Sequence, residues 1–302
     1  MRATGSRVKA SNCPLLKKPW HRILLVFLPV GLLAATDPAQ KAKVFEFQSS
    51  SAPTITISNL SGQVTVRSWD KDSVQATCTA SSPHVEVDAE PMPASGRADR
   101  VQFLTHILDP SIAGEAANAD YELNVPAGAS LEIRNRQGHV QVEGLTGETW
   151  VQSVGGSITV VDPSGHLDVD SVGGDVEIDR PAGHVEASSI NGNLKFVDPT
   201  STKIRGTTTS GRIIYEGDFA PGGEYVLSAY SGDMEILCPA SASFEVRAQS
   251  VKGRVDNGVD VIRNQHDATP RGAIGLVGTH NAGKARLDLR SYSGTIRLRT
   301  MR

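Results

Sequence analysis

The chain has 302 residues, with 30 Lys and Arg against 33 Asp and Glu, so its formal net charge is −3. This near balance excludes the strongly basic stripe that nucleic-acid-binding proteins need. Aromatic residues make up only 5% of the chain, which also contains 29 Gly and 16 Pro. Such a composition indicates many turns and thin cores of small aliphatic side chains, and it excludes a large aromatic-lined cleft.

The N-terminus has the pattern of an export signal, in which basic residues precede an apolar run from Ile23 to Ala35. That run is shorter than the roughly 20 residues that span a bilayer as a helix. We therefore predict a signal peptide over 1–35, a polar leader over 36–43 and no membrane span in the mature chain. The expected location is the periplasm, the cell surface or the medium. An uncleaved anchor is the alternative, because Leu33 fits a cleavage site after Ala35 poorly.

Cysteine usage is sparse. Cys13 lies in the export signal, which leaves Cys78 and Cys238. The two could pair in an oxidising compartment, but their spacing does not place them together, and buried or free thiols are the favoured interpretation. Since no Cys-x-x-Cys occurs, structural zinc is not expected.

A glycine that precedes a short apolar strand recurs every 18 to 21 residues, and this repeat sets the architecture. Apolar residues stand two and four positions after it and five and seven positions before it, so each repeat is two short strands with inward apolar faces. One unit cannot bury such a face, whereas stacked units form a continuous core. We predict an all-β solenoid over 44–302. Its turn glycines after Gly62 are Gly138, Gly156, Gly174, Gly192, Gly211, Gly232, Gly253 and Gly294.

The two corners of each coil carry different turn residues. Ser, Thr or Asn stands three residues before nearly every turn glycine, where stacked side chains could bond the backbone along the corner. The glycine is expected to supply a positive φ. Asp162-Pro163 and Asp198-Pro199 mark the return corner. One residue after the glycine, Asp and Arg alternate in sequence, which predicts opposite charges on neighbouring coils.

Two segments interrupt the repeat. Residues 70–125 contain four alternating strands, near 74–79, 84–88, 100–107 and 121–125, and are interpreted as a β extension of the first coils. Residues 257–283 are predicted to form an irregular loop or a degenerate coil. The last clear repeat ends close to Arg302, so its strand edge is a candidate for self-association.

Candidate chemistry gathers around one acidic group, made of Asp168, Asp170, Asp175, Glu177 and Asp179, with Glu186 one repeat further on. The acids are spaced two residues apart, which is typical of side chains on the solvated face of a strand. Trp150 is an isolated aromatic residue and does not form an aromatic platform for sugar rings. The 18-residue offset makes His166 and His184 neighbours, with Asp168 and Glu186 beside them, a set that could hold a divalent metal. A surface ladder of histidines is the favoured alternative. No phosphate loop, dinucleotide fingerprint or nucleophile elbow occurs, so neither catalytic residues nor cofactors are predicted.

The motifs SVGG[SD][IV]x[VI], SYSGTIRL near the C-terminus and DYELNVPAG at 120–128 resemble a bacterial family. Over residues 44–302 the chain resembles the putative-adhesin domains of unknown function, related to the head domains of auto-transporter adhesins. The resemblance implies an exported, single-stranded, right-handed parallel β-helix without known activity or catalytic residues. We therefore expect a non-enzymatic interaction module of the cell envelope whose partner is an envelope protein or a glycan.

Two alternatives remain open. The first is a carbohydrate-active β-helix enzyme, which requires the 70–125 or 257–283 insertion to wall a groove beside the acidic group. The second is an envelope sensor or assembly factor whose ligand binds an insertion loop.

Overall fold

The computed structural model describes residues 41–112, 114–263 and 274–301. The predicted signal peptide, most of the leader and the centre of the 257–283 insertion lie outside this part of the chain. Within it the fold is all-β, with one short 3-10 helix over Gly114–Ala117. No helix of the described residues is long and apolar enough to cross a membrane.

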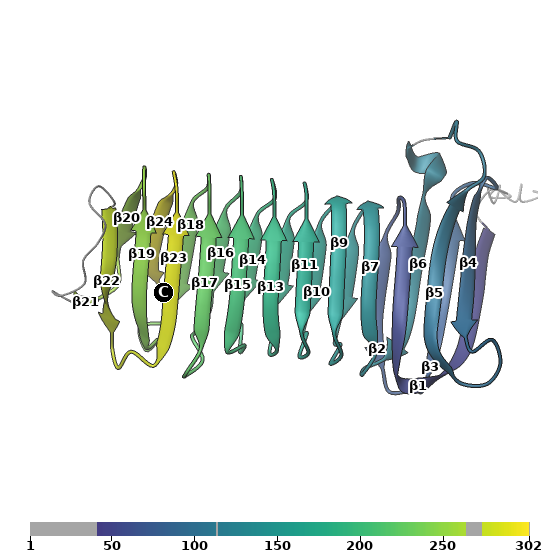
Figure 1. Cartoon of the computed structure of the whole chain (residues 1–302), viewed down its shortest axis with the longest axis horizontal. Helices are drawn as coiled ribbons and strands as arrows, with labels where there is room; N and C mark the ends of the chain where they lie inside the picture. The colour runs from purple at the N-terminus through teal and green to yellow at the C-terminus, as the bar shows by residue number, and fades with distance from the viewer. Residues whose placement is uncertain (1–40, 113, 264–273, 302) are drawn as a thin grey trace, which may run out of the picture. The chain divides into compact units, whose positions relative to one another are not determined.

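The central coils each place one strand in sheet B and one in sheet A (Figure 1). Successive strands of a sheet pair in parallel, with Leu167 opposite Val185 and Val176 opposite Leu194. The strands of sheet B are β7 (Ser130–Gln137), β9 (Thr149–Gly155), β11 (Leu167–Ser171), β13 (His184–Ser189), β15 (Lys203–Thr208) and β17 (Glu224–Ala229). Those of sheet A are β8 (Val140–Glu143), β10 (Ile158–Val161), β12 (Val176–Asp179), β14 (Leu194–Val197), β16 (Ile213–Glu216) and β18 (Met234–Cys238).

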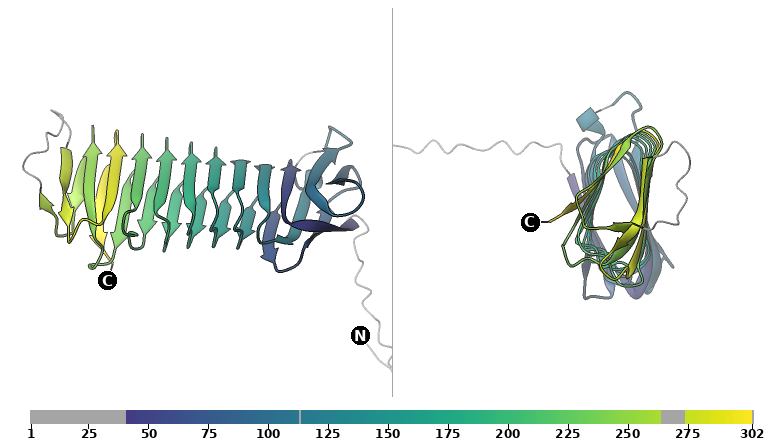
Figure 2. Two further views of the ribbon diagram at one scale, coloured as in Figure 1. Left: turned by 60° about the horizontal axis from the view of Figure 1, so that its bottom comes forward. Right: turned by 90° about the vertical axis from the view of Figure 1, so that its left-hand side faces the viewer.

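The two sheets enclose a narrow cross-section, seen end-on in Figure 2. The predicted inward columns form the core between them. Large and small residues compensate one another across it. Phe196 and Tyr215 on sheet A are fully buried, while sheet B supplies Ala187 and Gly206 at the facing level. A Cβ on Gly206 would lie only 3.1 Å from the Phe196 ring, so the small residue makes room for the large one.

The turn glycines are required chiefly because successive coils approach closely there. A Cβ on Gly174 would lie 1.8 Å from the carbonyl oxygen of Gly156, and one on Gly192 would lie 1.9 Å from that of Gly174. Positive φ, the predicted reason, applies to only some of the column, such as Gly138 with φ 109° and Gly156 with φ 146°. The repeat therefore keeps glycine to let the backbones stack.

The predicted polar corner is present and buried. Ser171 Oγ donates to the Gly174 carbonyl at 2.8 Å, and Ser189 Oγ accepts from the Gly192 amide at 2.8 Å. Both serines are under 5% exposed. At the return corner, Asp162 has φ 53° and accepts two hydrogen bonds from Arg180 of the next coil.

At the N-terminal end, the first coil in the sequence lies between two coils that follow it in the sequence. Its strands are β1 (Lys41–Asn59) and β2 (Val64–Trp69), and β1 begins inside the predicted leader. The 70–125 extension forms the four predicted strands, and β1 and β2 separate its last two from β7 and β8. The strands of the extension are β3 (Ser73–Ala80), β4 (Val85–Met92), β5 (Ala98–Ile107) and β6 (Ala119–Pro126).

Antiparallel strands close this end of the stack. β3 pairs with β6 and with the first half of β1, while β4 pairs with β5. Lys43 of β1 donates to the Val87 carbonyl of β4 at 3.1 Å and lies 3.5 Å from Glu86, so the outermost strands of the two sheets are in contact.

At the C-terminal end the spatial order of coils departs from the sequence order. β23 (Ala285–Ser291) pairs with β17 on one side and with β19 (Phe244–Ser250) on the other. β24 (Thr295–Thr300) likewise pairs with β18 and with β20 (Arg254–Asn257). The last coil is thus inserted inside the stack (Figure 1). The prediction that the last strand leaves a free edge is therefore wrong.

The inserted coil also corrects the predicted charge alternation at one point. Thr295 lies between Asp233 and Arg254, so the expected charge pair is replaced by contacts of Asp233 with the Thr295 amide and with Arg297, both at 2.8 Å. The 257–283 insertion contributes two strands beyond β19, β21 (Ile262–Arg263) and β22 (Ile274–His280), which pair antiparallel with each other and through β22 with β19. Cys78 and Cys238 are both buried and free, so they do not pair.

Candidate functional site

The outer face of sheet B carries a row of large polar side chains at one register position. Strand pairing aligns Glu132 with Trp150, Trp150 with Asp168, and Asp168 with Glu186. Residues that share a register position in a parallel sheet repeat at the strand spacing of about 4.8 Å. The row is therefore a straight line of an acid, an indole and two further acids.

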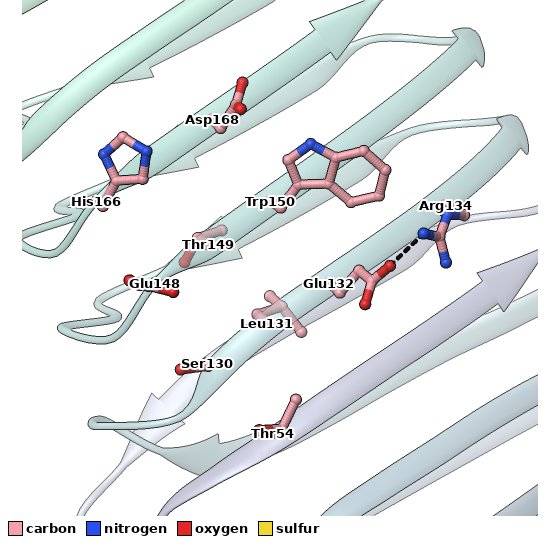
Figure 3. Close-up of a pocket in the computed structure, with 10 residues that line it drawn as sticks. All are labelled: Thr54, Ser130, Leu131, Glu132, Arg134, Glu148, Thr149, Trp150, His166 and Asp168. Carbon is pink, nitrogen blue, oxygen red and sulfur yellow. Dashed lines mark ion pairs between the residues drawn. The ribbon is translucent and has the colours of Figure 1, made fainter.

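A pocket of about 410 Å³ opens beside Trp150 (Figure 3). Its volume falls within the range of small-ligand sites. Strands β1, β7, β9 and β11 supply its walls, and the residues immediately before β9 and β11 complete it. The residues that line it are Thr54, Ser130, Leu131, Glu132, Arg134, Glu148, Thr149, Trp150, His166 and Asp168.

Trp150 is held in place by a neighbouring ion pair. The guanidinium carbon of Arg134 lies 4.9 Å from the indole ring centroid, and Arg134 Nη2 lies 2.5 Å from Glu132 Oε1. A cation over an indole face is stabilised by the ring quadrupole, so the three side chains orient one another. Trp150 thus presents a fixed, half-buried apolar plate on an otherwise polar face.

The acids beyond Trp150 lie on β11 and β13. Burial first, and then the nearby charges of Asp170 and Glu186, raise the pKa of the Asp168 carboxyl above its ordinary value. Asp170 accepts a hydrogen bond from the Ser188 hydroxyl on the next strand. The Asp168 carboxyl therefore holds its proton to a higher pH than an ordinary aspartate does.

The two histidines are brought together as predicted. The ring centroids of His166 and His184 lie 4.8 Å apart with an interplanar angle of 76°, and His184 Nε2 lies 3.2 Å from Glu186 Oε1. Burial, with the charges of Lys203 and His166, lowers the pKa of His184. Nevertheless, no three His, Cys, Asp or Glu side chains of the described residues are arranged to hold a metal ion.

The rest of the predicted acidic group is divided between faces. Asp168 and Asp170 belong to β11 of sheet B, whereas Glu177 and Asp179 belong to β12 of sheet A, on the opposite side of the core. Glu177 is paired there with Lys195 at 2.8 Å. The six acids of the sequence therefore do not form one site.

The sequence analysis does not assign a role in the site to Trp150. The signal was available, because Glu132 and Asp168 lie 18 residues before and after it in the same column. The insertions were also expected to bear on the site if it were catalytic. Instead, the strands of 70–125 and the described strands of 257–283 lie at the two ends of the stack (Figure 1).

Comparisons with known proteins give little guidance. No protein-family model matches the chain, and no curated protein matches it. Among solved structures, a putative cell adhesion protein from Clostridium sporogenes is similar at a TM-score of 0.33 and 10% identity, over 88% of this chain and 100% of that one. A likeness at that level supports no argument about this chain.

Proposed function

We propose that the protein is an exported, non-enzymatic interaction module of the cell envelope, and that the outer face of sheet B binds a glycan at Trp150. The observation that carries this proposal is the fixed indole in an open pocket of about 410 Å³, with acids aligned on both sides. The fold that we propose for it in full is a single-stranded, right-handed parallel β-helix.

The chemistry of the pocket suits a sugar ring. An indole plate offers apolar contact to the C–H face of a pyranose, while carboxylates and hydroxyls at the ring's edge accept and donate hydrogen bonds. Glu132 and Asp168 flank Trp150 on adjacent strands, within reach of the same ring. The row continues along the stack with Glu186, so an extended chain could contact several coils.

Export is part of the proposal because the glycans of the cell envelope lie outside the cytoplasm. It is supported by the basic residues and the apolar run that precede the β unit in the sequence. Analysis of the N-terminus of the protein purified from the envelope fraction would test it, and an uncut cytoplasmic chain would contradict it.

A glycan-binding measurement tests the site. Wild-type protein is screened against polysaccharide and oligosaccharide fragments, and hits are quantified by calorimetry. Trp150→Ala should abolish binding, whereas the control Lys195→Ala, on sheet A, should leave it unchanged. Equal binding by the wild type and Trp150→Ala would refute glycan recognition at this pocket.

A second candidate, carbohydrate hydrolysis, is favoured by one observation. Asp168 has a raised pKa and pairs in register with Glu186, which is the kind of environment that a general acid requires. Turnover of any glycan hit, measured as new reducing ends and lost in Asp168→Asn, would establish it in place of the non-enzymatic proposal. Binding without turnover would leave the interaction module.

A further inference from the structure

An exposed apolar ladder runs along the corner that joins sheet B to sheet A. Its members stand two positions before the turn glycines, a column in which only Arg136 and Thr209 are not apolar. The turns are the points above the arrowheads in Figure 1. Most of the exposed large hydrophobic side chains of the described residues belong to it. These are Leu60 at 37%, Val154 at 49%, Val172 at 38%, Ile190 at 48%, Tyr230 at 59% and Val251 at 54% exposure.

Backbone hydrogen bonds hold the ladder straight. The amide of Val172 donates to the Ser153 carbonyl at 3.0 Å and that of Ile190 to the Ser171 carbonyl at 3.0 Å, and the pattern continues to Tyr230 and Tyr292. At the C-terminal end the rings of Tyr230 and Tyr292 stack at 4.8 Å, with Lys252 Nζ 4.9 Å from the Tyr292 centroid.

The shape of the ladder argues against two kinds of partner. Its amides are used between coils, so it offers no strand edge for β-augmentation. A second copy would meet it along a line about 40 Å long and one side chain wide, given a coil spacing of about 4.8 Å. Such a contact buries a few hundred Å², well below the roughly 1,000 Å² of a stable interface.

The charge of the corner points to an anionic partner. The short segments from four residues before each turn glycine to one residue after it contain more basic than acidic residues, although the whole chain is net negative. The basic residues are Arg134, Arg136, Arg212, Lys252, Arg254 and Arg290, of which Arg134 is ion-paired with Glu132 and Arg290 with Asp288. The acidic residues are Asp170, Asp175 and Asp233, of which Asp233 is ion-paired with Arg297. With these pairs set aside, four basic residues remain against two acidic ones.

We propose that this corner is a peripheral membrane-binding edge, which lays the apolar ladder into the headgroup region of an anionic bilayer. A flat, deformable surface accommodates a straight convex ridge along its whole length. Tyrosines and a lysine at one end match the composition of membrane-interface anchors. The membrane-binding edge follows the corner, whereas Trp150, the central residue of the glycan pocket, lies on the outer face of sheet B, and Arg134 lies where the two surfaces adjoin.

Vesicle sedimentation tests the membrane-binding edge. Residues 38–302 form one compact unit that includes the whole core, so they can be produced without the apolar N-terminal segment. We expect them to sediment with phosphatidylcholine vesicles that contain 30% phosphatidylglycerol. The triple change Val154→Ser, Val172→Ser and Ile190→Ser should reduce the partition coefficient at least tenfold.

The matched control is Val161→Ser, Val197→Ser and Ile214→Ser, which removes outward aliphatic side chains of sheet A and should leave partitioning unchanged. An equal loss in this control would overturn the proposal, as would failure of the wild type to sediment. A wild-type dimer that the ladder variant dissociates would also overturn it, in favour of a second copy as the partner.

A charge variant covers the case in which the triple variant does not fold. Arg136 and Lys252 are exposed, and Arg136→Gln with Lys252→Gln should leave thermal unfolding unchanged. It should weaken binding to the anionic vesicles severalfold and reduce its salt dependence. Unchanged binding and unchanged salt dependence would contradict the membrane-binding edge.

Discussion

At the residue scale, Thr149 is a polar residue at a core position where its neighbours in register are aliphatic. Thr149 lies between Leu131 and Leu167 in register and is only 3% exposed, and no described residue forms a hydrogen bond with its Oγ1. A buried hydroxyl without a partner loses its hydration and gains nothing in return. This threonine is therefore a weakness of the scaffold directly beneath the Trp150 pocket.

We expect Thr149→Val to raise the free energy of unfolding by about 1–2 kcal/mol, because it removes the unpaired hydroxyl at nearly constant shape. Urea denaturation measures this. The matched control is Thr208→Val, which should lower the free energy of unfolding by about 1 kcal/mol. Its hydroxyl donates to the Gly192 carbonyl at 3.3 Å. Destabilisation by both substitutions would contradict the account of Thr149.

Asp168 gives a pH dependence with a definite sign. Its pKa in the native state is raised, so the native state holds the proton to a higher pH than the unfolded chain. The carboxyl therefore lowers stability as pH rises through this window. Asp168→Asn should increase the free energy of unfolding at pH 7 by roughly 0.5 kcal/mol, since solvent screens this partly exposed group, with no gain near pH 3. Denaturation at both pH values checks this, and a gain at pH 3 alone would contradict it.

Cys78 and Cys238 should be chemically inert in the folded protein. Burial raises the pKa of Cys78 to about 12 and that of Cys238 to about 11, so almost no thiolate exists at neutral pH. In protein produced from residue 38 onward, which lacks Cys13, Ellman's reagent should label neither thiol in buffer and both in 6 M guanidinium. Rapid labelling of either one in buffer would show that its strand opens.

At the element scale, a turn glycine and its neighbour test whether close approach of the coils explains the recurring glycine. Gly174 has a backbone carbonyl where its Cβ would be, whereas a Cβ on Gly173 would meet only the Val154 carbonyl, at 3.3 Å. Overpacking against backbone cannot be relieved by a rotamer change.

Gly174→Ala should therefore lower the free energy of unfolding by about 3 kcal/mol or more, and Gly173→Ala by less than about 1 kcal/mol. Thermal unfolding of the two variants measures the difference. Equal effects would mean that the coils separate enough to accept a Cβ and would contradict the close-approach explanation.

Much of this scale could be predicted from the sequence. The inward columns, the Ser/Thr corner and the four strands of 70–125 follow from periodicity, because each coil must bury the same face. The reason for the glycine column could not be predicted, since the approach of Gly174 to Gly156 depends on how tightly the corners stack. The prediction that the acids form one group was also wrong. Asp170 and Glu177 are close in sequence, but the chain turns a corner between them, so they lie on different sheets.

At the scale of the whole molecule, the order of coils could not be predicted. A repeat specifies which residues face inward, but any two coils with matching columns can stack, so it does not specify which coils are neighbours. β23 fits equally against β17 and β19 because all three present the same aliphatic face. The row from Glu132 to Glu186 needed only adjacent repeats in chain order, so these neighbours were readable from the 18-residue offset. Thr54, the lining residue from β1, was not readable in this way.

Hydrogen exchange tests the inserted coil. Amides of β23 and β24 should exchange as slowly as those of β15 and β16, because both sets are paired on two sides. Amides of β20, which pairs only with β24 among the described strands, should exchange faster. Faster exchange in β24 than in β20 would place the last repeat at the end of the stack and contradict the observed order.

The inserted coil also affects when the fold can be completed. A solenoid stacked in chain order can add each coil as it leaves the ribosome or a translocation pore. Here β17 and β18 obtain their final neighbours only after residues 285–300 have appeared, because β23 and β24 separate them from β19 and β20. The stack from β17 onward therefore reaches its final order only when the last repeat has left the ribosome or the pore.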